Sequence, residues 1–330
     1  MARLNILINA PIFENLIPSI EAIDPRVKVT FIGDLLKAER AGNAGASHQL
    51  DTLLEDAEVY SDMRIPENLL RRAPQLKWIQ LTSAGVEHAL NDELLHSPVI
   101  LTNAANLHSF VVAEFAIAAC LTLAKNVREF YRQKETGEWQ PLSPVILRGK
   151  TMGIVGFGHI GRRVARVAKA LDMRVIASRR SAHGSKNARY ADEMLTAADM
   201  DRLLSESDFV VLTVPLTAET RHLVGARELA LMKKTAFLVN VARGALVDED
   251  ALASALKNGE IAAAAMDVFA KEPLPGDSPL RDIPNLFFSP HVAGWIEEYP
   301  SMVLEVLISN IERYLKGERL KNVVNKQRGY

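Results

Sequence analysis

Short apolar runs alternate with helical patterns along most of the chain. The apolar runs predict strands, and their ranges are 5–9, 27–32, 58–60, 78–81, 152–155, 174–178, 209–214, 236–240, 263–267 and 286–289. Helical spacing predicts helices over 109–131, 159–171, 200–205, 248–257 and 296–316. This alternation is typical of parallel sheets covered by helices. No fixed period repeats, so we expect two α/β domains of different size rather than a repeat array.

Composition and charge narrow the possible classes of protein. A chain of 330 residues is long enough for two domains. Hydrophobic residues make up 48% and charged residues 24%, which excludes a disordered or fibrous chain. Lys and Arg number 39 against 40 Asp and Glu, so no overall basic field is available to bind nucleic acid.

The single cysteine excludes an intramolecular disulfide and any multi-cysteine metal site. Cys120 lies in the apolar run 113–124, which predicts a small buried hydrophobe. The eight histidines are scattered and indicate no metal site. Asn5 and Asn9 interrupt what would otherwise be a signal-peptide core, and no run approaches the roughly 20 apolar residues of a membrane span. We expect a cytoplasmic protein with no membrane partner.

A glycine loop joins the strand at 152–155 to the helix at 159–171. Its sequence is Gly156-Phe157-Gly158-His159-Ile160-Gly161. Gly156 would make the tight turn, Gly158 would let a pyrophosphate approach, and Gly161 would allow close packing of helix on strand. The helix N-terminus would bind the phosphates. A glycine-rich turn without function is the alternative, but the surrounding strands and helix favour a dinucleotide site.

The next strand, 174–178, ends in Arg179-Arg180. NAD sites place an acidic residue near this position, about 20 residues beyond the glycine loop. Arginine would instead pair with a 2′-phosphate, and Ser178 would add a hydroxyl donor. The alternatives are an exposed charge or an arginine stacked on adenine. Because no carboxylate stands from 175 to 184, we predict NADP(H) as the preferred cofactor, with NAD(H) as the other candidate.

Arg243, Glu272 and His291 each lie just beyond a predicted strand. An open α/β sheet binds ligands at the carboxyl ends of its strands. Taken singly, the three would be a surface arginine, a loop carboxylate and a core histidine. Their joint placement with a dinucleotide loop favours a catalytic site.

With these features the chain resembles the D-isomer-specific 2-hydroxyacid dehydrogenases, most densely from residue 78 to residue 291. The motifs that carry the resemblance are Ser83-Ala84-Gly85-Val86-Glu87-His88, Val112-Ala113-Glu114, Gly149-Lys150-Thr151, Ser207-Asp208-Phe209-Val210-Val211, Val214-Pro215-Leu216-Thr217, Asn240-Val241-Ala242-Arg243-Gly244, Asp267-Val268-Phe269, Glu272-Pro273 and Pro290-His291. The first 75 residues match weakly.

The resemblance implies two Rossmann-like or flavodoxin-like α/β domains with doubly wound parallel sheets and an active site in the interdomain cleft. The substrate-binding domain would be discontinuous, comprising residues 1–102 plus 293–330. The dinucleotide-binding domain would comprise residues 103–292. A homodimer through the dinucleotide-binding domains is also implied.

The resemblance also implies roles for single residues. Arg243, Glu272 and His291 would be catalytic. The backbone of Ala84 and Gly85 would cradle the substrate carboxylate, alongside Arg243. Asp267 would accept from the nicotinamide amide, and the other cofactor-binding residues outside the glycine loop and strand end would be Val214, Pro215, Thr220, Val241, Ala242 and Gly294. Tyr60 stands where the phosphoglycerate-oxidising branch has an arginine, which disfavours a substrate that carries a phosphate.

The residue types fit the reduction of a 2-oxo acid without a metal. Protonated His291 would give its proton to the carbonyl oxygen. Glu272 would orient the imidazole and favour its charged form. Arg243 would make a bidentate contact with the carboxylate and carbonyl of the substrate. The resemblance implies small substrates such as glyoxylate and hydroxypyruvate, because NADPH users that resemble this chain often reduce them. The alternative is a corepressor-like protein that senses dinucleotide without turnover, and the lack of an added tail or basic patch disfavours it.

Overall fold

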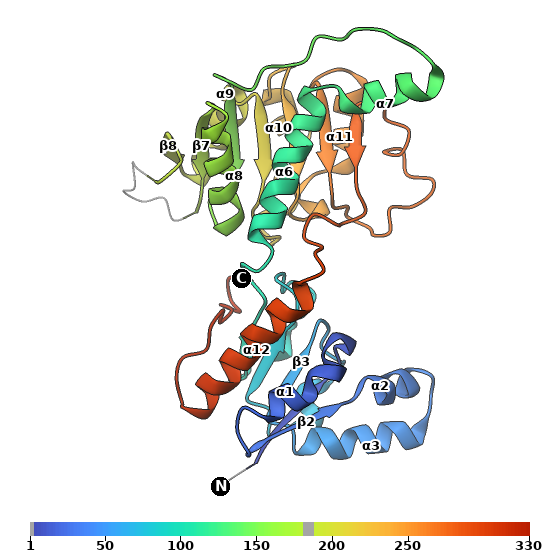
Figure 1. The fold of residues 1–330 in the computed structure, drawn as a ribbon, viewed down its shortest axis with the longest axis vertical. Helices are drawn as coiled ribbons and strands as arrows, with labels where there is room; N and C mark the ends of the chain where they lie inside the picture. Colours follow the sequence, from blue (N-terminus) through green and yellow to red (C-terminus); the bar gives the residue numbers. More distant parts are fainter. Residues whose placement is uncertain (1–2, 181–187) are drawn as a thin grey trace. The chain divides into compact units, whose positions relative to one another are not determined.

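The structure, a computed structural model, describes residues 3–180 and 188–330 and divides into two compact units (Figure 1). The first unit comprises Met1–Leu107 and Ile296–Tyr330, and the second comprises His108–Trp295. The boundaries expected from the sequence, 102/103 and 292/293, lie a few residues before these.

The first unit is built on a five-stranded parallel sheet in the order β2-β1-β3-β4-β5. Its strands are β1 (Leu4–Ile8), β2 (Val27–Phe31), β3 (Val59–Asp62), β4 (Trp78–Leu81) and β5 (Ile100–Thr102). Its helices are η1 (Pro11–Leu16), α1 (Ile17–Glu21), α2 (Gly33–Arg40), α3 (Ala44–Glu55), α4 (Leu69–Arg72), α5 (Asp92–His96) and α12 (Tyr299–Leu315). This order is that of flavodoxin-like sheets.

Neighbouring residues of β1 pack on opposite faces of this sheet. Leu7 belongs to the core that includes Leu36 of α2 and Leu50 of α3. Ile6 and Ile8 belong to the other core, together with Leu307 of α12. The period of two along β1 therefore explains why the C-terminal helix, distant in sequence, covers one face of the first sheet.

The second unit is built on a seven-stranded parallel sheet in the order β12-β11-β10-β9-β6-β7-β8. Its strands are β6 (Thr151–Val155), β7 (Arg174–Ser178), β8 (Glu193–Leu195), β9 (Phe209–Leu212), β10 (Phe237–Asn240), β11 (Ala263–Met266) and β12 (Leu286–Phe288). Its helices are α6 (Ser109–Ala124), α7 (Val127–Thr136), α8 (His159–Ala170), η2 (Ala197–Asp199), α9 (Met200–Glu206), α10 (Ala226–Leu231), η3 (Gly244–Leu246) and α11 (Glu249–Lys257). The order reverses direction between β6 and β9, as in dinucleotide-binding sheets. The expected pair of doubly wound α/β domains is thus confirmed.

Helices cover both faces of this second sheet. In Figure 1, α6 and α8 lie in front of the strands, and they pack on residues such as Ile154 and Val211. On the opposite face α9, α10 and α11 pack on residues such as Val210 and Leu212. The strands are buried on both faces, as their nearly continuous apolar sequences require.

The predicted helix over 109–131 is wrong in one respect, because the structure divides it into α6 and α7. The break falls at Asn126, whose φ of 54° lies in the left-handed region that asparagine tolerates better than most residues. Within the described ranges no single helix is long and apolar enough to cross a membrane, and α6 and α7 pass that test only as a pair bent by 58°.

Cys120 is fully buried within α6. Burial raises the pKa of its thiol to about 12, so the neutral thiol packs as a small apolar group.

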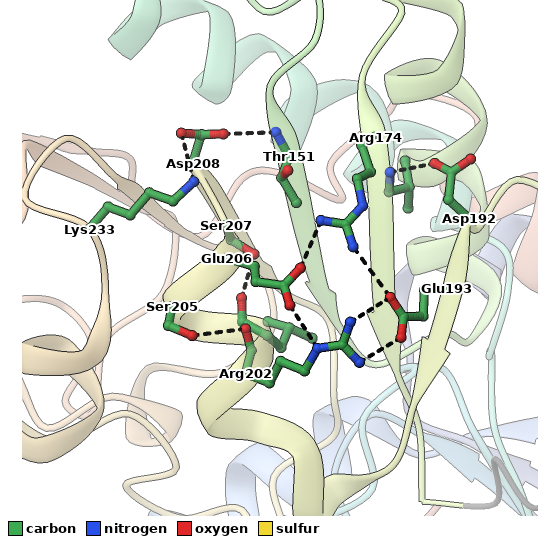
Figure 2. Close-up of polar contacts among 12 residues, drawn as sticks. Thr151, Arg174, Asp192, Glu193, Arg202, Ser205, Glu206, Ser207, Asp208 and Lys233 are labelled. Carbon is green, nitrogen blue, oxygen red and sulfur yellow. Dashed lines mark hydrogen bonds and ion pairs between the residues drawn. The ribbon is translucent and has the colours of Figure 1, made fainter.

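Charged side chains at the amino ends of β7 and β8 pair with one another (Figure 2). Arg174 lies 2.7 Å from Glu206 and 3.3 Å from Glu193. Arg202 lies 2.6 Å from Glu193 and 2.7 Å from Glu206. These partly exposed pairs contribute about 0–1 kcal/mol each, and the two arginines and two glutamates offset one another's charge.

Candidate active site at the carboxyl edge of the second sheet

Most residues that the sequence analysis selected follow strands of the second sheet. The glycine loop follows β6, Arg179 follows β7, Val214 follows β9, Arg243 follows β10, and His291 follows β12. Because all these strands are parallel, their carboxyl ends lie along one edge. The fold therefore gathers residues from distant parts of the sequence at a single edge.

The glycine loop adopts a conformation that only small residues allow. Gly156 has a φ of +102°, and a Cβ there would lie 2.8 Å from Val214 Cγ1. A Cβ on Gly161 would lie 2.1 Å from the carbonyl oxygen of Gly156, so α8 packs directly on the turn. A Cβ on Gly158 would meet no described atom within 4 Å, and both Gly158 and His159 are exposed at the start of α8. This open helix N-terminus fits a pyrophosphate.

Hydrogen bonds join three strand ends through the glycine loop. The N–H of Gly156 donates to Ser178 O of β7 at 3.0 Å. Thr213, which the sequence analysis missed, donates from Oγ1 to Gly156 O at 2.6 Å. Ser178 itself is buried, and Ile160 is partly buried.

The turn after β9 is organised by the hydroxyl of Thr220. Its Oγ1 donates to the carbonyl oxygen of Pro215 at 2.8 Å and accepts from the N–H of Thr217 at 2.8 Å. The turn is therefore ordered in itself, and it presents exposed Pro215 and Glu219 beside the glycine loop.

The two arginines after β7 have different surroundings. Arg180 pairs with Glu219 in the turn after β9. Arg179 is partly buried, and its Nε is fully buried without a hydrogen-bond partner in the described parts of the chain. A buried donor without an acceptor costs about 1–3 kcal/mol, so this position fits an acceptor supplied by a ligand.

His291 and Glu272 are brought into direct contact. His291 Nδ1 lies 2.7 Å from Glu272 Oε2, and the two side chains are about half and one third exposed. The other oxygen, Oε1, accepts from the N–H of Phe269 at 2.8 Å. The hydrogen bond from Phe269 thus holds the carboxylate of Glu272 in place. The carboxylate in turn orients the imidazole of His291 so that Nδ1–H points toward Glu272. Nε2 makes no hydrogen bond to any described group and can carry a proton to a ligand.

The loop that carries His291 is held by the buried carboxylate of Asp267. Its Oδ1 accepts from Ser289 Oγ at 2.6 Å and from the N–H of Val292 at 2.9 Å. Its Oδ2 accepts from the N–H of Ala293 at 3.0 Å. His291 has a φ of +55°, a costly conformation that these bonds support. Three of the roughly four acceptor positions are therefore used inside the protein, which leaves one for the expected nicotinamide amide.

The loops that carry Arg243 and Glu272 are in close contact through Gly244. A Cβ on Gly244 would lie 1.9 Å from the carbonyl carbon of Phe269. Arg243 Nη1 donates to the carbonyl oxygen of Ala242 at 2.7 Å. Glu249 of α11 accepts from the N–H of Ala270 at 2.6 Å. The close approach at Gly244 brings the loop of Arg243 against the loop of Glu272.

The remaining expected cofactor residues lie beside these loops. Val241 and Ala242 are almost fully buried after β10. A Cβ on Gly294 would lie 3.1 Å from His108 Nδ1, so this position also accepts only a small residue without rearrangement. No group of three or more potential metal ligands occurs within residues 3–180 and 188–330.

Ala84 and Gly85 belong to the first unit, in the loop after β4. Asn103 Nδ2 donates to the carbonyl oxygen of Ala84 at 2.7 Å, and Ser83 Oγ donates to that of Gly85 at 2.8 Å. The backbone N–H groups of Ala84 and Gly85 donate to no described group of the protein. Two adjacent donors of this kind can bind a carboxylate.

Comparisons with known proteins give consistent results. Residues 117–293 match the family model of the D-isomer specific 2-hydroxyacid dehydrogenase, NAD binding domain. The glyoxylate/hydroxypyruvate reductase B of Pectobacterium atrosepticum is 38% identical over 277 residues, which cover 80% of this chain and 83% of that protein. The glyoxylate reductase of Aeropyrum pernix is 38% identical over 289 residues, covering 84% of this chain and 83% of that protein.

Similar solved structures belong to proteins with the same kinds of name. A D-isomer specific 2-hydroxyacid dehydrogenase from Xanthobacter autotrophicus, in complex with NADPH and MES, has a TM-score of 0.81 and 28% identity, with full coverage of both chains. The NADPH-dependent glyoxylate/hydroxypyruvate reductase of Sinorhizobium meliloti, in complex with NADP and sulfate, has a TM-score of 0.82 and 25% identity. It covers 99% of this chain and 100% of that one.

The contact at Gly244 can be tested by adding one methyl group. Gly244→Ala should lower the free energy of unfolding by about 1–3 kcal/mol, because backbone atoms must move apart. Gly276→Ala, in the segment after Glu272, is the matched control, since a Cβ there meets no described atom within 4 Å. Urea denaturation measures both. Equal stability of Gly244→Ala and wild type would contradict the close approach.

Proposed function

Because the chain belongs to the D-isomer specific 2-hydroxyacid dehydrogenases, we propose that it reduces small 2-oxo acids, such as glyoxylate and hydroxypyruvate, with NADPH. The observation that carries this proposal is the contact between His291 and Glu272 on the same sheet edge as a glycine loop suited to a dinucleotide. The names of its relatives support the substrates. They do not favour a corepressor-like protein without turnover.

Arg243, Glu272 and His291 act together in the proposed reaction. When bound, reduced nicotinamide supplies the hydride that C2 of the oxo acid receives. His291 gives the proton on Nε2 to the carbonyl oxygen, while Glu272 holds the positive imidazolium in place through Nδ1. Arg243 binds the carboxylate and the carbonyl oxygen of the substrate. His291 then regains its proton from solvent.

The remaining residues of the proposed site would bind the cofactor and the substrate. The N-terminus of α8 and the glycine loop would hold the pyrophosphate. The adjacent N–H groups of Ala84 and Gly85 in the first unit are suited to binding a carboxylate. Tyr60 is fully buried, and its hydroxyl contacts Asp62 and the carbonyl oxygen of Arg64. It therefore provides no cation for a substrate phosphate, which supports unphosphorylated substrates.

The preference for NADPH rests on the end of β7. Arg174, at the start of this strand, is neutralised by two carboxylates, whereas Arg179 has a buried Nε without an acceptor in the described structure. A 2′-phosphate would supply charged acceptors for Arg179 and Arg180. The complexes of two structural neighbours with NADPH and NADP support this choice.

We also propose a homodimer that uses α7 and the segment after it. This surface exposes large apolar side chains, namely Val127, Phe130, Tyr131, Trp139 and Ile146. Trp139 is 97% exposed, yet the residues on either side of it in the sequence are held by side-chain contacts to α7. Glu138 pairs with Arg132 at 2.6 Å, and the N–H of Gln140 donates to Gln133 at 2.8 Å. Several large apolar side chains exposed on one helix and the ordered segment after it are typical of an interface.

The proton donor is tested by replacing His291. His291→Ala should lower kcat with glyoxylate or hydroxypyruvate by roughly 10²–10⁴-fold, the usual contribution of a general acid. The dissociation constant of NADPH should stay nearly unchanged, as measured by fluorescence titration. His48→Ala, an exposed histidine of the first unit, should retain full activity. Normal turnover of His291→Ala would exclude His291 as the proton donor. A wild-type protein that fails to oxidise NADPH with any 2-oxo acid tested would exclude the proposed reaction.

The cofactor preference is tested by reversing the charge of Arg179. Two charge-assisted contacts of about 1.5–3 kcal/mol each predict that NADPH is favoured by roughly two to four orders of magnitude in kcat/KM. Arg179→Asp should reduce that ratio sharply, because the carboxylate repels the 2′-phosphate. Arg148→Asp makes the same charge change at the opposite edge of the sheet and should leave the ratio unchanged. A wild type that prefers NADH would overturn this part of the proposal.

The dimer is tested by light scattering of purified variants. Trp139→Ala and Ile146→Asp should each shift the protein toward half the wild-type mass, since both remove apolar contact area. Met63→Asp, at an exposed apolar side chain of the first unit, should leave the mass unaltered. If neither variant dissociates a dimeric wild type, the interface lies elsewhere.

A further inference from the structure

An ion pair connects two strand ends that flank the glycine loop. Arg180 follows β7, and Glu219 lies in the turn after β9. In the sheet order β6 lies between these two strands, and its own carboxyl end carries the loop. The pair therefore joins the two sides of the region where the adenosine half of a dinucleotide binds to such sheets.

Glu219 is placed there by an ordered turn rather than by chance. The two hydrogen bonds of Thr220 close the turn from Pro215 onward. The side chains of Arg180 and Glu219 are 51% and 70% exposed. Water screens an exposed pair of this kind, so a competing anion can displace the carboxylate.

Resting on the proposed use of NADPH, we propose that Glu219 is a specificity-determining residue, because it competes with the 2′-phosphate for Arg180. Before the cofactor binds, the guanidinium of Arg180 is held by the carboxylate of Glu219. A 2′-phosphate must take over that guanidinium, and its own negative charge then lies near the displaced carboxylate. Glu219 thus weakens the binding of NADPH but not of NADH, which carries no phosphate at this position.

On this proposal the two arginines contribute differently to the binding of the 2′-phosphate. Arg179, with its buried Nε, would make the fixed contact with the phosphate, and Arg180 would make a contact opposed by Glu219. The opposition is electrostatic, so its effect should shrink as salt concentration rises.

The experiment uses calorimetric titration of the full-length protein with adenosine 2′,5′-bisphosphate and with adenosine 5′-monophosphate. Glu219→Gln should bind the bisphosphate roughly three- to tenfold more tightly than wild type at low ionic strength. Its affinity for the monophosphate should change less than twofold. Asp201→Asn, which removes the carboxylate from another exposed pair, with Arg227, should alter neither affinity.

A double-mutant cycle identifies Arg180 as the contested group. In an Arg180→Gln background the further change Glu219→Gln should have little effect on either ligand. An undiminished effect there would overturn the competition for Arg180, as would a Glu219→Gln variant that binds the bisphosphate no more tightly than wild type. Separately, a wild type that binds both ligands equally would overturn the proposed use of NADPH itself.

Discussion

The buried carboxylate of Asp267 is the interaction on which the candidate site depends. Burying a charge without partners would be prohibitively unfavourable, so this carboxylate requires its three donors from Ser289, Val292 and Ala293. Those donors fix the loop between them, including the left-handed backbone of His291. With the loop fixed, the imidazole meets Glu272. Asp267 thereby determines where His291 can deliver a proton, although its side chain bonds to neither the imidazole of His291 nor the carboxylate of Glu272.

The two edges of the second sheet differ in how completely their charged groups are paired. At the amino edge, Arg174 and Arg202 share Glu193 and Glu206, and the charges cancel among themselves (Figure 2). At the carboxyl edge, Arg180 pairs with Glu219 and His291 with Glu272, but the buried Nε of Arg179 has no partner in the described structure. Exposed pairs contribute little to stability, whereas groups left with unused donors can bind a ligand. The same parallel topology creates both edges, since it directs every strand end and every following loop to one side.

Close approach of backbones couples the loops along this edge. Gly161 lets α8 lie on the turn at Gly156, and Gly244 lets the loop of Arg243 lie on Phe269. Hydrogen bonds from Thr213 and from Gly156 extend the coupling to β9 and β7. Such contacts transmit small displacements directly, because packed backbones have no flexible side chains between them.

Local patterns in the sequence were sufficient for most of the strands, for the glycine loop and for the order of the chemical groups along the chain. Apolar runs and glycines act over a few residues, so their consequences are visible in the sequence itself. The pattern predicted one helix over 109–131, because the apolar spacing continues past Asn126 while the backbone turns there. Strands β5 and β8 have only three residues each and were not predicted. The equally short β12 was predicted because all three of its residues, Leu286-Phe287-Phe288, are large and apolar.

Only the tertiary structure decided which groups meet. Gly244 stood in a recognised motif, but its contact with Phe269 depends on β10 and β11 being neighbours in the sheet. Ser289 and Thr213 gave no signal beyond ordinary polar residues, and the pairing of Arg180 with Glu219 joins residues from two strand ends. The sequence determined which chemical groups the chain carries. The parallel sheet decided their partners, because strand order brings together residues that lie far apart along the chain.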